Sequence, residues 1–179
     1  CGEGNLATHL SQTGMCVTGV DFSKVNLETA KKNDFNRRVD YVLANASKLP
    51  YPDAQFDIVS AVDLLEEVEN PQQLISEAAR VLKPGGLFFF HTFNRTPLSY
   101  LIKIKGSKWL NKNTAKRTPR YRHFIKPSEM KNFCDDNSLM VRDIVGIRPM
   151  LNAMIRKAIQ TKKMNLEFKI TKRNSIGYM

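Results

Sequence analysis

The chain opens on Cys1-Gly2-Glu3-Gly4, a glycine turn followed by a run of helical character over residues 5–13. An apolar run over residues 16–20 comes next and ends on Asp21. Two glycines, a helix start, a short strand and an acidic residue about 20 positions later form the layout of a nucleotide-binding βαβ unit. Glycine is needed in such a turn because a side chain would hold a ligand away from the backbone.

The carboxylate of Asp21 suits a ribose diol, because it can accept two hydroxyl hydrogen bonds. In such a unit the turn follows a strand, whereas this chain starts at Cys1, already inside the turn. We therefore expect a fragment that lacks its first strand, which lies in the middle of the sheet in this fold. The alternative, a helix start preceded by a flexible end, stays open at this point.

Composition is that of an ordinary globular protein. The chain has 179 residues, of which 42% are hydrophobic and 25% charged, so a single domain over 1–179 is expected. No apolar run approaches the length that spans a bilayer. Three widely spaced cysteines, Cys1, Cys16 and Cys134, indicate reduced thiols of a cytoplasmic protein and have no metal-binding spacing.

The net charge of +11 is unevenly distributed along the chain. Residues 1–94 carry 8 basic and 12 acidic side chains, whereas residues 95–126 carry 10 basic and no acidic ones. Such a block indicates a polyanionic partner, either an anionic lipid surface or nucleic acid. A solvated loop without a partner is the alternative.

Strands and helices are predicted to alternate along most of the chain. Apolar runs predict strands at 39–43, 56–62 and 87–92, and helices are predicted at 23–33, with Ser23 as cap, and at 71–82, after Asn70-Pro71. The acidic stretch 63–69 is predicted to be helical. Beyond the basic block we expect a helix at 127–137, a strand at 139–147, a helix at 149–163 and strands within 165–179. Continuous apolar strands favour an α/β, Rossmann-like, mostly parallel sheet covered by helices on both faces.

Ligands of open α/β sheets bind where the strands end. Several residues fall at such ends and are expected to line one crevice: Gly2, Gly4, Asp21, Asn45, Ala46, Val62 and Asp63.

These motifs resemble those of class I S-adenosylmethionine-dependent methyltransferases. The first motif of that family ends in Gly-Cys-Gly-x-Gly, whose tail matches residues 1–4, and later motifs match 20–21, 56–59 and 82–87. The resemblance implies roles for six residues toward S-adenosylmethionine. Gly2 and Gly4 approach its methionyl part, Asp21 holds the ribose, Asn45 and Ala46 flank the adenine, and Val62 lies against the cofactor.

A narrower resemblance is to the ubiquinone-biosynthesis O-methyltransferases, and it covers segments 63–68, 70–71, 92–96 and 124–127. These enzymes methylate phenol hydroxyls on polyprenylated ring intermediates. The resemblance implies that this chain is an enzyme transferring a methyl group to a phenol or catechol hydroxyl of such a precursor. Another small-molecule methyltransferase, or an RNA methyltransferase using the basic half, is the alternative.

In that family the segment after the fourth strand reads Glu-x-x-Glu-His and binds a divalent metal in some members. Here Asp63, Glu66 and Glu67 take those places, and on a helix the three carboxylates could converge on Mg²⁺. They are the predicted catalytic and metal-binding residues, with an exposed acidic helix start as the alternative. Because Glu67 replaces the histidine, a candidate base is lost. His91 lies inside a predicted strand and is interpreted as a packed or hydrogen-bonded residue, with a catalytic base as the alternative.

The basic amphipathic insert 95–126 interleaves apolar and aromatic residues with lysines, as segments that lie on anionic lipid do. We therefore expect a peripheral protein at the inner membrane face, docked where a polyprenyl tail emerges. Nucleic acid is a less favoured partner, because no base-clamping Pro-Pro-Tyr/Trp motif is visible.

Overall fold

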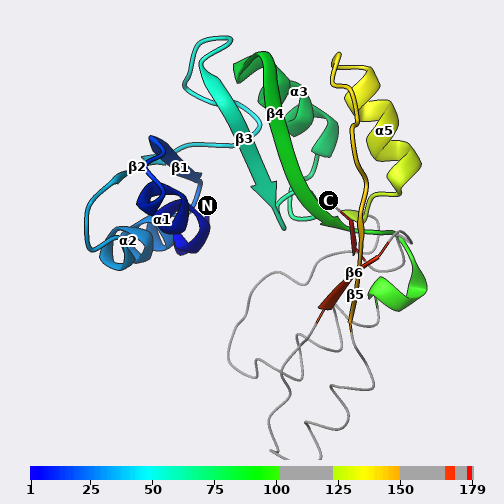
Figure 1. The fold of residues 1–179 in the computed structure, drawn as a ribbon, viewed down its shortest axis with the longest axis horizontal. Coiled ribbons are helices and arrows are strands. Elements are labelled where there is room, and N and C mark those ends of the chain that lie inside the picture. The colour runs from blue at the N-terminus through cyan, green and yellow to red at the C-terminus, as the bar shows by residue number, and fades with distance from the viewer. Residues whose placement is uncertain (101–122, 150–167, 172–176, 179) are drawn as a thin grey trace, which may run out of the picture. The chain divides into compact units, whose positions relative to one another are not determined.

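The computed structural model describes residues 1–100, 123–149, 168–171 and 177–178. The chain forms two compact units, which we name the N-terminal unit, Cys1–Gln55, and the C-terminal unit, Phe56–Met179 (Figure 1). The predicted helix 149–163 and most of the basic insert lie outside the described residues. That residues 1–179 form a single domain stays a prediction.

The N-terminal unit contains two helices and two strands: α1 (Asn5–Gln12), β1 (Val17–Asp21), α2 (Lys24–Asn33) and β2 (Val39–Leu43). The two strands pair in parallel, with Val17 opposite Val39 and Asp21 opposite Leu43. Their carboxyl ends therefore meet at one edge. The strands and helices predicted for this part of the chain are confirmed, with ends that differ by a residue or so.

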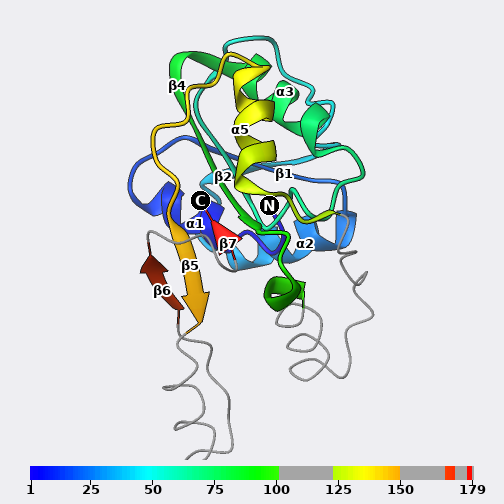
Figure 2. The same ribbon diagram turned by 90° about the vertical axis from the view of Figure 1, so that its right-hand side faces the viewer.

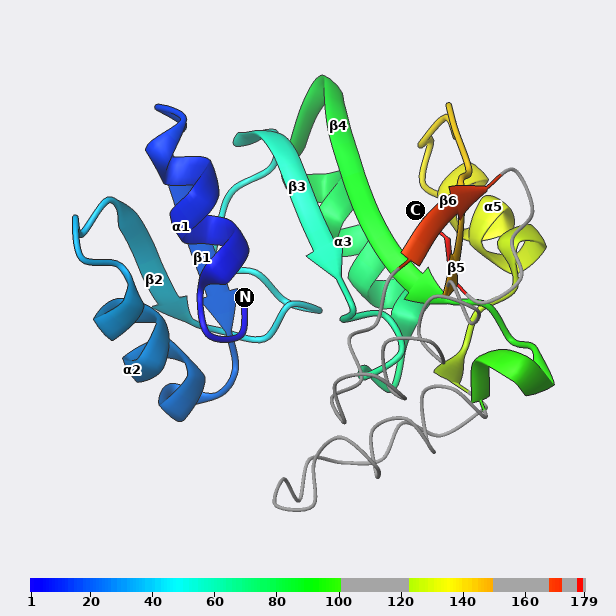
Figure 3. The same cartoon turned by 60° about the horizontal axis from the view of Figure 1, so that its bottom comes forward.

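Both helices pack against the β1–β2 pair (Figure 3). The core between them consists of small and apolar side chains around one aromatic ring: Ala7, Leu27, Ala30, Val39 and Tyr41. Gly19 lies opposite Tyr41, and a Cβ there would come within 2.8 Å of the ring. The ring therefore occupies the space that a side chain at Gly19 would need. As predicted, the Ser23 hydroxyl caps α2 by accepting from the Asn26 N–H at 3.3 Å.

Among its described residues, the C-terminal unit includes these elements: β3 (Phe56–Val62), α3 (Pro71–Val81), β4 (Leu82–Phe93), α5 (Pro127–Asp135), β5 (Gly146–Pro149), β6 (Phe168–Thr171) and β7 (Gly177–Tyr178). The strand order is β3-β4-β7-β5-β6. β3 and β4 are parallel, as predicted, whereas the other pairs are antiparallel. The parallel strands β3 and β4 thus come first in this unit. The short strands β5, β6 and β7 follow later in the chain and extend the sheet beyond β4.

Helix α3 begins where the Asn70-Pro71 pair predicts, because the Asn70 side chain accepts the Gln73 N–H at 3.1 Å. Its apolar face is buried and comprises Leu74, Ile75, Ala78 and Val81. The helix packs against β4, and α5 lies beside it (Figure 2). Each large apolar side chain buried in this way stabilises the unit by about 1.5–3 kcal/mol.

Three predicted elements differ from the structure. Residues 63–69 form a turn and not a helix, and Asp63 has a φ of 53°, in the left-handed region. β4 begins at Leu82, before the predicted start, because the segment after α3 already pairs with β3 through a register shift between Phe56 and Ile58. Of the predicted strand 139–147, only Gly146 and Ile147 pair in a sheet, and residues 139–145 have no regular secondary structure.

The described ends of the basic insert lie against each other. The Ile125 N–H donates to the Phe93 carbonyl at 3.2 Å, and the rings of Phe93 and Phe124 stack with centroids 5.6 Å apart. The Arg95 guanidinium donates to the Phe124 carbonyl at 2.7 Å and to Glu129 at 2.8 Å. We call this group of contacts the insert base. In the described part of the chain, no helix has the length and apolar character that crossing a bilayer requires.

Candidate active site

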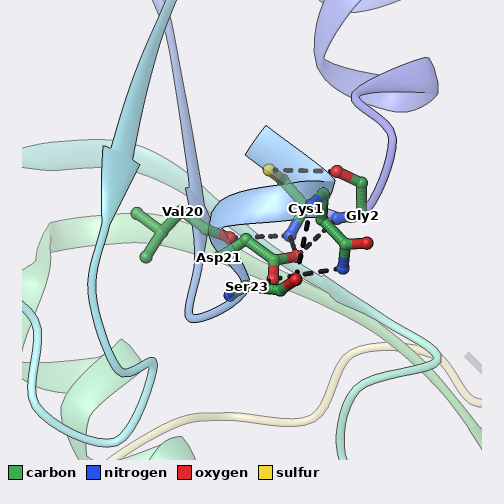
Figure 4. A network of polar contacts seen from close by, with 6 residues as sticks. Cys1, Gly2, Val20, Asp21 and Ser23 are labelled. Carbon is green, nitrogen blue, oxygen red and sulfur yellow. Dashed lines mark hydrogen bonds and ion pairs between the residues drawn. The ribbon is translucent and has the colours of Figure 1, made fainter. Parts of the chain in front are cut away.

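The carboxylate of Asp21 connects the glycine turn to the end of β1 (Figure 4). Its Oδ2 accepts the Gly2 N–H at 2.7 Å and the Cys1 amino group at 3.1 Å. Its Oδ1 accepts the Ser23 N–H at 2.9 Å and the Asn26 side-chain amide at 3.3 Å. One side chain therefore fixes the turn before α1 and the start of α2, although these lie about 20 residues apart.

The environment of Asp21 favours its charged form. Burial raises the pKa of this carboxyl, but the N–H groups of Ser23 and Gly2, together with the hydrogen bond and charge of the Cys1 amino group, outweigh it and hold the pKa below its ordinary value. At neutral pH the group is an ionised acceptor, as a ribose-binding role requires.

The two glycines of the turn meet different surroundings. Gly4 has a φ of 80°, and a Cβ there would lie 2.6 Å from the Tyr41 hydroxyl and 2.8 Å from the Ala30 Cβ. Gly2 has a φ of 58°, and nothing lies within 4 Å of where its Cβ would be. Packing within the unit thus already requires glycine at position 4. Position 2 borders open space that a ligand can enter.

The loop after β2 lies beside the end of β1, because the Ala44 N–H donates to the Asp21 carbonyl at 3.1 Å. Asn45 and Ala46 follow directly, and the Asn45 side chain accepts the Ser47 N–H at 2.9 Å. The structure therefore brings these two residues to the edge that carries Asp21. Their contact with adenine stays a prediction, as does the cofactor contact of Val62, a 43% exposed residue at the end of β3 in the C-terminal unit.

At the end of β3 the carboxylate of Asp63 lies against a histidine. Asp63 Oδ1 is 2.5 Å from His91 Nδ1, and the Asp63 N–H donates to the His91 carbonyl at 3.1 Å. The imidazole is 15% exposed and the carboxylate 52%. His91 is a hydrogen-bonded residue, as predicted, but its partner was missed. The sequence could have indicated this contact, because Asp63 and His91 come at the ends of two predicted strands that pair in parallel.

The three predicted catalytic carboxylates do not come together. Glu66 is completely buried and accepts a hydrogen bond from the Thr92 hydroxyl at 3.0 Å, whereas Asp63 contacts His91 and Glu67 lies in the turn. The predicted convergence required a helix, which the left-handed backbone at Asp63 interrupts. Within the described ranges, no three Asp, Glu, His or Cys residues are grouped so that they could hold a metal ion. This geometry therefore gives no support to Mg²⁺ on these three residues, and their catalytic and metal-binding roles stay predictions.

A hollow of about 280 Å³ lies at the insert base of the C-terminal unit. Its lining includes Pro71, Arg95, His123, Ile125 and Glu129. None of the predicted site residues lines it, and two of its charged residues, Arg95 and Glu129, pair with each other. We therefore do not assign the candidate site to this hollow.

Comparison with known proteins identifies the family. Residues 1–90 match the model of the methyltransferase domain family. The chain is 35% identical over 150 residues to a ubiquinone biosynthesis O-methyltransferase of Saccharophagus degradans, covering 82% of this chain and 64% of the relative. It is 36% identical over 149 residues to the protein of that name from Coxiella burnetii, with the same coverage. The chain thus spans 64% of the length of these relatives.

Among solved structures, a SAM-dependent methyltransferase from Methanosarcina mazei matches with a TM-score of 0.67 and 20% identity, over 99% of this chain and 88% of that one. This likeness confirms the predicted fold class, the α/β Rossmann-like fold of class I methyltransferases. On the match of its first 90 residues, the chain belongs to the methyltransferase domain family.

Proposed function

We propose that this protein is an S-adenosylmethionine-dependent O-methyltransferase that acts on a phenol or catechol hydroxyl of a polyprenylated ubiquinone precursor. The observation that carries the proposal is the 35% identity, over 150 residues, to a relative named for ubiquinone biosynthesis O-methylation. The narrower motifs in segments 63–71 and 92–96 support the same acceptor class.

The N-terminal unit fits the adenosyl cofactor. Gly2 leaves room for close approach, and the ionised Asp21 is a hydroxyl acceptor at the end of a parallel strand. A ribose hydroxyl would replace the longest of the four hydrogen bonds to Asp21, the one from Asn26 at 3.3 Å. When bound, S-adenosylmethionine supplies a methyl group on a positively charged sulfur. The chain's own contribution is to hold the acceptor oxygen in line with that methyl group, and such alignment accounts for a large part of the rate gain in group transfer.

An acceptor comparison tests this function. The protein is incubated with S-adenosylmethionine and, in parallel, with a farnesyl-substituted catechol, unsubstituted catechol or total RNA, and products are identified by mass spectrometry. We expect a mono-O-methyl product from the farnesyl catechol, formed more efficiently than from unsubstituted catechol. Methylated RNA without any methylated phenol would contradict the proposal and favour the nucleic-acid alternative.

We further propose that the basic insert 95–126 binds an anionic membrane surface, which makes the protein peripheral at the cytoplasmic side of the inner membrane. Ten basic and no acidic residues in this segment support the proposal. The insert base holds the two described ends of the segment together.

Vesicle flotation tests the membrane proposal. We expect salt-sensitive flotation with vesicles containing phosphatidylglycerol and none with phosphatidylcholine alone. Replacing Lys103, Lys105, Lys108 and Lys112 by Gln should abolish it, whereas the matched change of Lys31 and Lys32 in α2 should not. Equal flotation of both variants would contradict the role of the insert.

A further inference from the structure

Asp63 and His91 form a pair that is held at two points. β3 and β4 are in register with Val62 opposite His91, so the residue after Val62 is beside the histidine. The Asp63 N–H binds the His91 carbonyl, and the two side chains meet at 2.5 Å. The ring of Phe93 lies edge-on to the imidazole, with centroids 5.6 Å apart. The orientation of the imidazole is therefore determined by both backbone and side-chain contacts.

This contact determines the protonation pattern of the ring. A carboxylate only accepts hydrogen bonds, so the proton between the side chains is on Nδ1. The neutral imidazole then has its lone pair on Nε2, and Nε2 has no hydrogen-bond partner among the residues that the structure describes. The ring is not sealed in the core, since 15% of its surface is exposed. A histidine with a carboxylate on one nitrogen and a lone pair on the other is arranged as a proton acceptor.

Two further observations favour a functional role. Asp63 has a φ of 53°, in the left-handed region, where non-glycine residues are uncommon and are found more often at functional sites. In addition, Glu67 stands where the resembling O-methyltransferases have a histidine, and its backbone N–H is bonded within the turn to Leu64. The chain thus has no imidazole at position 67 but has one at the end of the neighbouring strand.

We infer that His91 is the general base that deprotonates the acceptor hydroxyl, and that Asp63 is its positioning residue; this rests on the proposed O-methyl transfer. An unperturbed phenol has a pKa of about 10, so it needs a proton acceptor at neutral pH. His91 Nε2 takes the hydroxyl proton while the acceptor oxygen bonds to the methyl carbon. The carbon–sulfur bond breaks and its electron pair stays on sulfur. The positive charge passes to the imidazolium, which then releases the proton to water.

The variant His91→Asn tests the base. An asparagine amide can replace the Nδ1–H donor toward Asp63, so the pair remains bonded, but nothing replaces Nε2. We expect kcat for the farnesyl catechol to fall about 100-fold or more, with the affinity for S-adenosylmethionine in isothermal titration unchanged. His9→Asn, on α1, where the ring binds the Asn5 carbonyl, is the matched control and should keep full activity.

The variant Asp63→Gly tests the positioning role, because glycine accepts the positive φ and removes only the carboxylate. We expect a loss in kcat of about tenfold or more. Asp57→Ala, near the start of the same strand and paired with Lys83, is the matched control. Full activity of His91→Asn in an active wild-type background would overturn the inference.

A spectroscopic readout is independent of the acceptor. Nitrogen-15 spectra of the imidazole side chains should assign the Nδ1–H tautomer to His91 in the wild type and the Nε2–H tautomer in Asp63→Gly. An Nε2–H tautomer in the wild type would overturn the inference, because no lone pair would face the acceptor. If the wild type methylates no phenol at all, the proposed function fails, and the tautomer measurement still decides whether the pair is arranged as inferred.

Discussion

Asp21 in the N-terminal unit and Asp63 in the C-terminal unit each come at the end of a parallel strand, yet their carboxylates have different tasks. Asp21 is 9% exposed and accepts backbone N–H groups, which fix the glycine turn and the start of α2. Asp63 is 52% exposed and orients the ring of His91. The comparison teaches that the same position at a strand end can hold a carboxylate with different partners: backbone N–H groups around Asp21 and an imidazole beside Asp63.

The variant Asp21→Asn is expected to have the largest effect and tests the role of the Asp21 carboxylate in this comparison. The amide nitrogen of asparagine would face N–H donors, so at least one of the Gly2 and Ser23 hydrogen bonds is lost. We expect the affinity for S-adenosylmethionine to fall about 100-fold and the free energy of unfolding to fall by roughly 2–3 kcal/mol. Isothermal titration and urea unfolding measure the two effects. The exposed Asp40→Asn on β2 is the control, and an unchanged cofactor affinity in Asp21→Asn would refute the binding role.

Variants of Gly2 and Gly4 separate the packing of the N-terminal unit from ligand binding. Gly4→Ala places a methyl group against Tyr41 and Ala30, so we expect a loss of about 2 kcal/mol in the free energy of unfolding. Gly2→Ala meets open space and should lose only about 1 kcal/mol for its positive φ. Because Gly2 borders the proposed ligand space, its variant should instead weaken S-adenosylmethionine binding. Urea unfolding and titration of both variants separate packing from ligand approach, and equal effects of the two would contradict this division.

The pH dependence of stability gives a smaller effect. The pKa of Asp21 is lowered in the folded protein, so its carboxylate contributes stability in full above the unfolded-state pKa of about 3.9. That contribution is lost as the pH falls through the lower folded-state pKa. The difference in free energy of unfolding between wild type and Asp21→Asn should therefore shrink on acidification below about pH 4. A difference that stays constant down to pH 2 would contradict the assignment.

The smallest expected effect is a difference in thiol reactivity between the two units. Burial, followed by the charge of Asp135, raises the pKa of Cys134 to about 11, whereas Cys1 and Cys16 are exposed. Titration with a thiol-specific chromogenic disulfide at pH 8 should therefore show two fast thiols and a third that reacts only on unfolding. Three fast thiols in the native protein would contradict the burial of Cys134.

Local sequence signals predicted most of the N-terminal unit and, in the C-terminal unit, the start of α3. The Ser23 cap, the Asn70-Pro71 helix start and the apolar strands are encoded by adjacent residues, so they could be found without tertiary information. The glycine turn and Asp21 were also placed correctly beside each other, because a βαβ layout brings them together.

The errors have tertiary causes. The acidic composition of residues 63–69 favours an exposed helix, but Glu66 is buried and bonded to Thr92, 26 residues away. The His91 contact depends on the register between β3 and β4, which no local pattern specifies. Likewise, the Lys83–Gly86 stretch follows the end of α3 as predicted, but the strand begins before it, because Leu82 already pairs with Phe56 and the register shifts before Leu87 pairs with Ile58.

The insert base has a consequence for how this protein can change over time. The chain leaves the sheet at Phe93 and returns next to it at Ile125, so the bridge between them does not depend on what lies in between. Doubling the length of such a closed segment costs only about 0.6 kcal/mol in loop entropy. The segment can therefore be replaced by one of another sequence or length at little cost in stability. Such a replacement could change the surface or acceptor that the protein binds without altering the residues at the strand ends.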